Sequence, residues 1–348
     1  MGGLLSYSGL TTKIRAMQSQ LIGLAELREI VELGSVAQVV AYLKEKPGYA
    51  KLWTDMDEMA LNRLSIETLL RQSIYQNYTR IYRFSNPEQK KFLDLYFKRY
   101  EMMLMKNCLG HIFDRREVVL DLSGFEQFFA KHSKLNLARL TEVRNLGDFI
   151  ECLRGTEYYT PLYQLYANGG EQLMVFDYGM ALDQYYFAQI WKYKDKIFTG
   201  KDLKEITAAY GQKFDLLNLS WIYRSKKYYH MDPARIYSLL IPVTHRLKQD
   251  DMIALVEAQN MEEFATYLSR TYYGRIYQEL TPEKLEEAYT ELMSILLRKE
   301  SSQNPHSVVV MYSYLFHKEH EVNRLTTAVE CVRYGVSPEE AMEHIKRS

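Results

Sequence analysis

Two short sequence patterns each occur three times along the chain, and their spacing restricts the folds open to it. The first pattern is a short amphipathic helix, then a turn, then an aromatic-rich helix start. The last leucines of the three short helices are Leu43, Leu153 and Leu268, which are 110 and 115 residues apart in a chain of 348 residues. Repetition at a fixed period indicates copies of one structural unit.

The second pattern is an acidic residue in a long predicted helix, directly preceded by an aromatic residue or a histidine. Its acids are Glu101, Asp215 and Glu321, which follow the three leucines by 58, 62 and 53 residues. Two patterns in the same register predict three homologous helical domains of about 110 residues each. The predicted domains are residues 1–118, 119–228 and 229–348.

The distribution of prolines and apolar residues predicts helices throughout. Four of the eight prolines follow a residue that caps helix starts, and these are Pro87, Pro233, Pro282 and Pro338. Segment 88–108 repeats apolar residues at three- and four-residue steps, as an amphipathic helix does. Similar segments are 56–82, 200–224, 283–299 and 307–333. No segment has the alternation of a strand, so we predict an all-α protein.

Composition excludes several classes of protein. Lysine plus arginine equals aspartate plus glutamate at 44 each, whereas a nucleic-acid binder needs a basic surplus. Cys108, Cys152 and Cys331 lie too far apart for a disulfide framework or a cysteine-rich zinc site, which favours a reduced, cytosolic setting. We expect neither a membrane span nor a signal peptide, because no apolar run reaches about 18 residues and the first residues lack a leader pattern.

Two motifs contain residues of the kinds that carry chemistry. Asp250-Asp251 resembles the start of the D-D-x-x-D magnesium-diphosphate motif of all-α isoprenoid enzymes, but Ala254 stands where the third carboxylate is needed. An acid pair at a helix start explains it better. His317 and His320 could hold a metal together with Glu321, but no second cluster supplies further ligands, so a solvated helix face is favoured.

No phosphate-binding glycine loop and no nucleophile elbow occurs either. We therefore predict no catalytic residue, no cofactor and no metal. The 29 tyrosines leave two readings open, packing between helices, which is favoured, and contact with partners. The tyrosine pairs are Tyr158-Tyr159, Tyr185-Tyr186, Tyr228-Tyr229 and Tyr272-Tyr273.

Several of these features together resemble a known family. Tyr7, the run Lys13-Ile14-Arg15-Ala16-Met17 and the element Asp215-Leu216-Leu217-Asn218-Leu219 resemble the C subunit of V/A-type rotary ATPases, called the d subunit in eukaryotes. The length and the three-fold repeat are similar too, so the resemblance covers essentially the whole chain. The chain departs from the element in its other two copies, where Leu104 and Arg324 stand in place of Asn218.

The resemblance implies a non-catalytic connector. Family members form a funnel of three pseudo-symmetric helical domains on the cytoplasmic face of the membrane, bound peripherally to the proteolipid (c/K) ring. The funnel receives the foot of the rotating central stalk, formed by the D and F subunits. It passes torque between ATP hydrolysis or synthesis and the transport of H⁺ or Na⁺. One copy per complex implies a monomer.

The repeated acids are our candidates for the stalk socket. Glu101, Asp215 and Glu321 come from the repeat, with Asn218 and Arg324 near them on the same helices. The alternative is that these acids cap or pair within their own domains. Two other functions stay open, a generic helical-repeat scaffold and an all-α enzyme. The first is disfavoured because usual helical repeats span about 34 to 47 residues, and the second depends on the incomplete Asp250-Asp251 motif.

Overall fold

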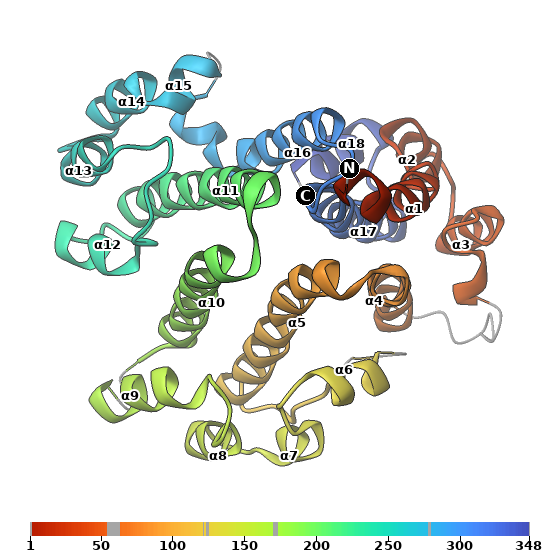
Figure 1. The fold of residues 1–348 in the computed structure, drawn as a ribbon, viewed down its shortest axis with the longest axis horizontal. Helices are drawn as coiled ribbons and strands as arrows, with labels where there is room; N and C mark the ends of the chain where they lie inside the picture. The colour runs from red at the N-terminus through yellow and green to blue at the C-terminus, as the bar shows by residue number, and fades with distance from the viewer. Residues whose placement is uncertain are drawn as a thin grey trace. The chain divides into compact units, whose positions relative to one another are not determined.

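Helices form the fold of this protein in a computed structural model, which describes residues 2–53, 63–120, 122, 125–169, 173–277 and 280–347. No strand occurs within these ranges, so the all-α prediction is confirmed (Figure 1). Helices begin at the four predicted prolines, because each proline suits a first helical turn. These helices are α5 (Pro87–Phe113), α12 (Pro233–Leu239), the short 3₁₀ helix η4 (Pro282–Lys284) and α18 (Pro338–Arg347).

The chain packs into two compact units. One unit comprises Met1–Lys90, Asp121–Phe129 and Ser294–Ser348, and the other comprises Lys91–Leu120 and Ala130–Met293. The first unit therefore joins the two ends of the sequence. The division into three domains at residues 118 and 228 stays a prediction.

The first unit is built around α17 (Val309–Arg333), which packs against helices from both halves of the sequence. Its neighbours include α1 (Gly2–Gln18), α2 (Leu24–Val31), α3 (Val36–Glu45), α4 (Arg63–Phe84) and α18. The 3₁₀ helix η1 (Ala50–Trp53) packs on α3 and α4. A helix with neighbours on most sides buries most of its side chains. Along α17 these include the charged Lys318 and Glu321.

The second unit contains α5 after residue 90 and the pair α10 (Val175–Ile197) and α11 (Gly200–Lys227), which pack on each other. Short helices follow α5 and α11. Those before α10 are α6 (Glu126–His132), which straddles the two units, α7 (Leu137–Glu142), α8 (Leu146–Cys152) and α9 (Tyr159–Gly169). Those after α12 are α13 (Gln249–Glu257), α14 (Met261–Arg270) and α15 (Tyr272–Ile276). The longer α16 (Leu285–Gln303) comes next, and its second half belongs to the first unit.

The first repeated pattern is visible in the local geometry. The helices α3, α8 and α14 each begin after a residue whose side chain accepts a hydrogen bond from the backbone three residues on, and these residues are Ser35, Asn145 and Asn260. Leu43 in α3, Leu268 in α14 and Leu153, directly after α8, are fully buried. The sequence period therefore corresponds to three short helices with the same kind of cap and the same buried leucine.

Candidate functional site

The three repeated acids lie in the middle of long helices and are removed from water. Glu101 is on α5, Asp215 on α11 and Glu321 on α17, and they are 5%, 0% and 4% exposed. A buried carboxylate is costly unless hydrogen-bond donors replace water. The donors around each acid therefore show what the acid holds in place.

Asp215 holds a loop and a tyrosine. Its Oδ2 accepts hydrogen bonds from the backbone N–H groups of Arg246 at 2.6 Å and Leu247 at 2.9 Å, and from the Tyr273 hydroxyl at 2.9 Å. Its Oδ1 accepts the backbone N–H of His245 at 3.2 Å. Burial raises the pKa of the Asp215 carboxyl, and these four donors oppose the rise.

Glu101 has the same kinds of neighbour. Its Oε1 accepts a hydrogen bond from the Ser133 hydroxyl, and its Oε2 accepts one from the hydroxyl of the buried Tyr158. The Ser133 oxygen in turn accepts the backbone N–H of Leu135 at 3.0 Å, so the serine bridges the acid to the loop. Burial raises the pKa of Glu101, and the bonds from Ser133 and Tyr158 oppose it.

Glu321 completes the series with a buried ion pair. Its Oε1 accepts the backbone N–H of Ile22 at 2.6 Å, and its Oε2 lies 2.6 Å from Lys318 Nζ. Lys318 also donates to the Tyr49 hydroxyl at 2.8 Å, so the lysine links the acid to the tyrosine. Burial lowers the pKa of Lys318, and the Glu321 charge opposes this.

Each acid is thus linked, directly or through one side chain, to a loop residue just before a short helix and to a tyrosine after the next buried leucine. The loop residues are Ile22, Leu135 and Leu247. The tyrosines are Tyr49, Tyr158 and Tyr273. We call each set of acid, loop residue and tyrosine an acid anchor. The loop residue and the tyrosine of each anchor come from the sequence copy after the one that contains the acid. For the third acid, Glu321, they come from the first copy.

The remaining two candidates differ from each other. Asn218 is fully buried, donates from Nδ2 to the carbonyl of Ile241 at 3.0 Å and accepts the Ile241 N–H at Oδ1, 2.9 Å away. It therefore clamps the same connecting segment that Asp215 holds. The half-buried Arg324 lines a cavity beside Glu321, and Leu104 is a buried apolar residue. The Asn218 clamp therefore has no equivalent at either of these positions.

Sequence reasoning missed part of each anchor. The sequence pair Tyr158-Tyr159 did not show which of the two is used, and the hydroxyl that reaches Glu101 belongs to Tyr158, directly before α9. A distance of five residues from the buried leucine would have identified both Tyr158 and Tyr273. Lys318 gave no such signal, because a lysine three residues before an acid also fits an exposed helix face.

The expectation of a solvated face at His317, His320 and Glu321 was wrong. Both histidines are 8% exposed, because α17 lies at the centre of its unit. His317 uses both ring nitrogens, with Nδ1 at 2.6 Å from the Ser313 carbonyl and Nε2 at 2.9 Å from the Ser294 hydroxyl. Over the described part of the chain, no group of three or more histidine, cysteine, aspartate or glutamate side chains could hold a metal ion.

Other sequence motifs are accounted for locally. Asp250 and Asp251 lie in the first turn of α13, where Asp251 Oδ2 accepts the N–H of Lys248 at 3.1 Å, so the interpretation as a helix-start pair is confirmed. The tyrosine pairs divide. Tyr158 and Tyr273 are buried, whereas Tyr228 and Tyr229 are more than half exposed. None of the described helices is both long enough and apolar enough to span a membrane.

The acid anchors define a class, an all-helical protein that uses one anchoring motif three times. Sequence comparison then gives its family. A family model described as "ATP synthase (C/AC39) subunit" matches residues 10–344, and the chain belongs to this family. The resemblance noted from the sequence is therefore confirmed.

Curated relatives match this chain over nearly its whole length. The chain is similar to the C subunit of the A-type ATP synthase of Methanosarcina mazei, with 25% identity over 96% of this chain and 91% of the relative. The protein of the same name from Methanocaldococcus jannaschii is 23% identical over 96% of this chain and 84% of the relative. The one from Pyrococcus abyssi is 24% identical over 97% and 90%.

Proposed function

We propose that this chain is the non-catalytic connector of a V/A-type rotary ATPase. In this role one copy binds the D and F subunits of the central stalk on one side and the membrane proteolipid ring on the other, at the cytoplasmic face. Rotation of the stalk, driven by ATP hydrolysis, then turns the ring and moves H⁺ or Na⁺. The same coupling can run in the direction of synthesis.

The observation that carries the proposal is the family match over residues 10–344. Relatives named as C subunits of A-type ATP synthases cover nearly the whole chain as well. A match of this extent supports a shared role for the chain as a whole, and not only for one segment.

The acid anchors suit a part that transmits torque. Packed helices are stiff, and fully hydrogen-bonded buried networks make them stiffer. We propose that Glu101, Asp215, Glu321 and Asn218 serve the stalk site by holding loops, because each of them bonds to a loop or to a residue next to it. Arg324 is the fifth proposed residue, since it lies beside Glu321 on α17.

The exposed residues of the held loops are then the points of contact with the stalk. Lys134 and Arg246 are exposed and directly precede the buried Leu135 and Leu247. Charged residues at the edge of an interface set orientation and association rate more than affinity. Such contacts suit a protein–protein interface that must form in a single orientation.

Reconstitution of the whole ATPase with and without the chain tests the proposal. Without the chain, we expect the catalytic head to hydrolyse ATP while ion transport into vesicles is lost, and added chain should restore transport. A purified chain should show no ATP turnover alone. Full ion transport in the complex that lacks the chain would rule out the connector role.

A further inference from the structure

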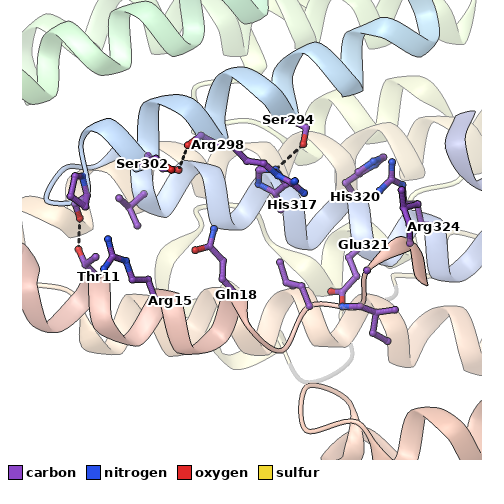
Figure 2. Close-up of a pocket in the computed structure, with 17 residues that line it drawn as sticks. Thr11, Arg15, Gln18, Ser294, Arg298, Ser302, His317, His320, Glu321 and Arg324 are labelled. Carbon is purple, nitrogen blue, oxygen red and sulfur yellow. Dashed lines mark hydrogen bonds between the residues drawn. The ribbon is translucent and has the colours of Figure 1, made fainter. Parts of the chain in front are cut away.

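A cavity of about 650 Å³ in the first unit lies beside the Glu321 acid anchor, with Ile22, Glu321 and Arg324 among its lining residues. Its other lining residues have no part in the acid anchors or the proposed function. It lies between α1, the second half of α16, α17 and the segment that leads into α2 (Figure 2). Its volume is that of a site for a small molecule. All the residues that line it belong to one compact unit.

Positive charge dominates the lining. Arg15 of α1, Arg298 of α16 and Arg324 of α17 reach it from three helices. Of the described residues that line the cavity, Glu321 is the one carboxylate, and it is already paired with Lys318 and with the backbone N–H of Ile22. The arginines therefore bring a net positive charge that this lining carboxylate does not balance.

The histidine at the cavity wall holds Arg298. His317 Nδ1 lies 2.6 Å from the carbonyl oxygen of Ser313, so it carries the proton, and Nε2 accepts from the Nε–H of Arg298 at 3.2 Å and lies 2.9 Å from the Ser294 hydroxyl. Burial lowers the pKa of His317 to about 4, which keeps the ring neutral and able to accept. One edge of the guanidinium is thereby fixed. Its two terminal nitrogens form no hydrogen bond or ion pair with any described residue.

Arg15 is also available to a ligand. It is exposed, points toward the cavity, and its side chain forms no hydrogen bond or ion pair within the described ranges (Figure 2). Gln18, one turn further along α1, and Ser302 on α16 add neutral donors to the lining. Two guanidinium groups with nearby neutral donors match the oxygens of a phosphate group, since arginine binds phosphate through paired N–H groups.

We propose that this cavity binds a phosphate-bearing anion. Arg15 and Arg298 contact the phosphate oxygens, and His317 is a positioning residue that holds Arg298. The phosphate comes either from a free ligand in solution or from an anionic lipid headgroup, and the chemistry of the site is the same for both.

Pyrophosphate and vesicles separate the two sources. The full chain is titrated with pyrophosphate by calorimetry and by its melting temperature, which a ligand of the folded state raises. It is also sedimented with phosphatidic acid vesicles and with neutral phosphatidylcholine vesicles. Replacement of both Arg15→Gln and Arg298→Gln should weaken binding by about tenfold or more, and added salt should weaken it too.

The matched control is Arg28→Gln, because Arg28 is an exposed arginine of the same unit outside the cavity. We expect this variant to bind as the wild type does. A third variant, His317→Phe, should weaken binding less than the loss of Arg298 itself, because the charge stays.

The results distinguish a free ligand, a lipid headgroup and the absence of a phosphate site. Pyrophosphate binding that the double variant loses supports a free ligand. Binding only to phosphatidic acid vesicles, again lost in the double variant, supports a lipid headgroup. Failure to bind either probe, or binding that survives in a folded double variant, overturns the proposal. The assays need no stalk or ring, so their result is independent of the proposed function.

Discussion

The three repeated acids are buried, and a different set of hydrogen-bond donors stabilises the charge of each one. Asp215 has three backbone N–H groups, Glu101 has two hydroxyls and Glu321 has a lysine. The backbone N–H donors connect Asp215 directly to the loop. Lys318 instead supplies an opposite charge, and its loss would leave the buried charge of Glu321 uncompensated.

At the residue scale we predict that Tyr273→Phe destabilises the fold. The change removes one of four donors to Asp215 and leaves its shape almost unchanged. We expect the free energy of unfolding to fall by about 1 to 3 kcal/mol, as for other bonds to buried charged groups. Chemical denaturation measures it. Tyr272→Phe is the control, since the Tyr272 hydroxyl has no hydrogen bond among the described residues, and an equal loss in both variants would refute the assignment.

The neutral His317 gives a second prediction, a pH dependence of stability. Its pKa is lowered from 6.5 to about 4 in the folded chain, mainly by burial. Between these values the unfolded chain binds more protons, so stability falls as the pH falls through this window. The contribution is at most about 3 kcal/mol.

Thermal unfolding between about pH 4 and pH 7 measures the slope, and His317→Gln removes the titrating group. The difference in stability between wild type and variant should change in favour of the variant as the solution becomes more acidic. A difference that stays constant over this range would show that His317 is not buried in its neutral form.

At the element scale, the loop before α13 approaches α11 closely because α11 has a glycine at the point of contact. Gly211 lies one turn before Asp215 on α11. A Cβ atom on Gly211 would lie 2.5 Å from Cγ of His245. The glycine therefore permits the loop to reach the acid. A side chain there has to push the His245 ring or the loop away.

We predict that Gly211→Ala costs about 1 to 3 kcal/mol in the free energy of unfolding, since overpacking displaces the loop. The control is Gly110→Ala on α5, where a Cβ atom meets nothing within 4 Å. That change should be neutral or stabilising by up to about 1 kcal/mol, because alanine favours a helix. Adding His245→Ala to Gly211→Ala should recover part of the loss, and no recovery would refute the steric explanation.

Sequence reasoning succeeded at this scale where the signals are local. Capping residues and first-turn prolines predicted the starts of α5, α12 and α18, and apolar periodicity predicted α11 and α17. It failed where the answer depends on packing. The histidines of α17 resemble an exposed face in sequence, and only the helices around α17 bury them.

The candidate site was predictable in part for the same reason. The period selected the three acids, but their partners come from segments far away in the chain, such as Ile22 for Glu321. The hydroxyl that binds Glu101 belongs to Tyr158 and not to Tyr159, the next residue in the sequence. Such choices depend on tertiary distances, which a pattern of residue types does not contain.

At the scale of the whole molecule, we propose that the chain binds the rotating stalk through the loops that its acid anchors hold. The acids themselves are poor targets for testing contact, because they are buried and their replacement disturbs the fold. The exposed Lys134 and Arg246 are better targets, since they lie beside the held residues and face solvent.

The most direct measurement is a calorimetric titration of the purified chain with the stalk heterodimer of the D and F subunits from the same organism. We predict a one-to-one complex, weakened by about tenfold in Lys134→Glu and in Arg246→Glu. The exposed Lys204→Glu on α11 should bind as the wild type does. Absence of binding at micromolar concentrations to a folded stalk would contradict the connector role, and binding that both loop variants retain would contradict the loop assignment.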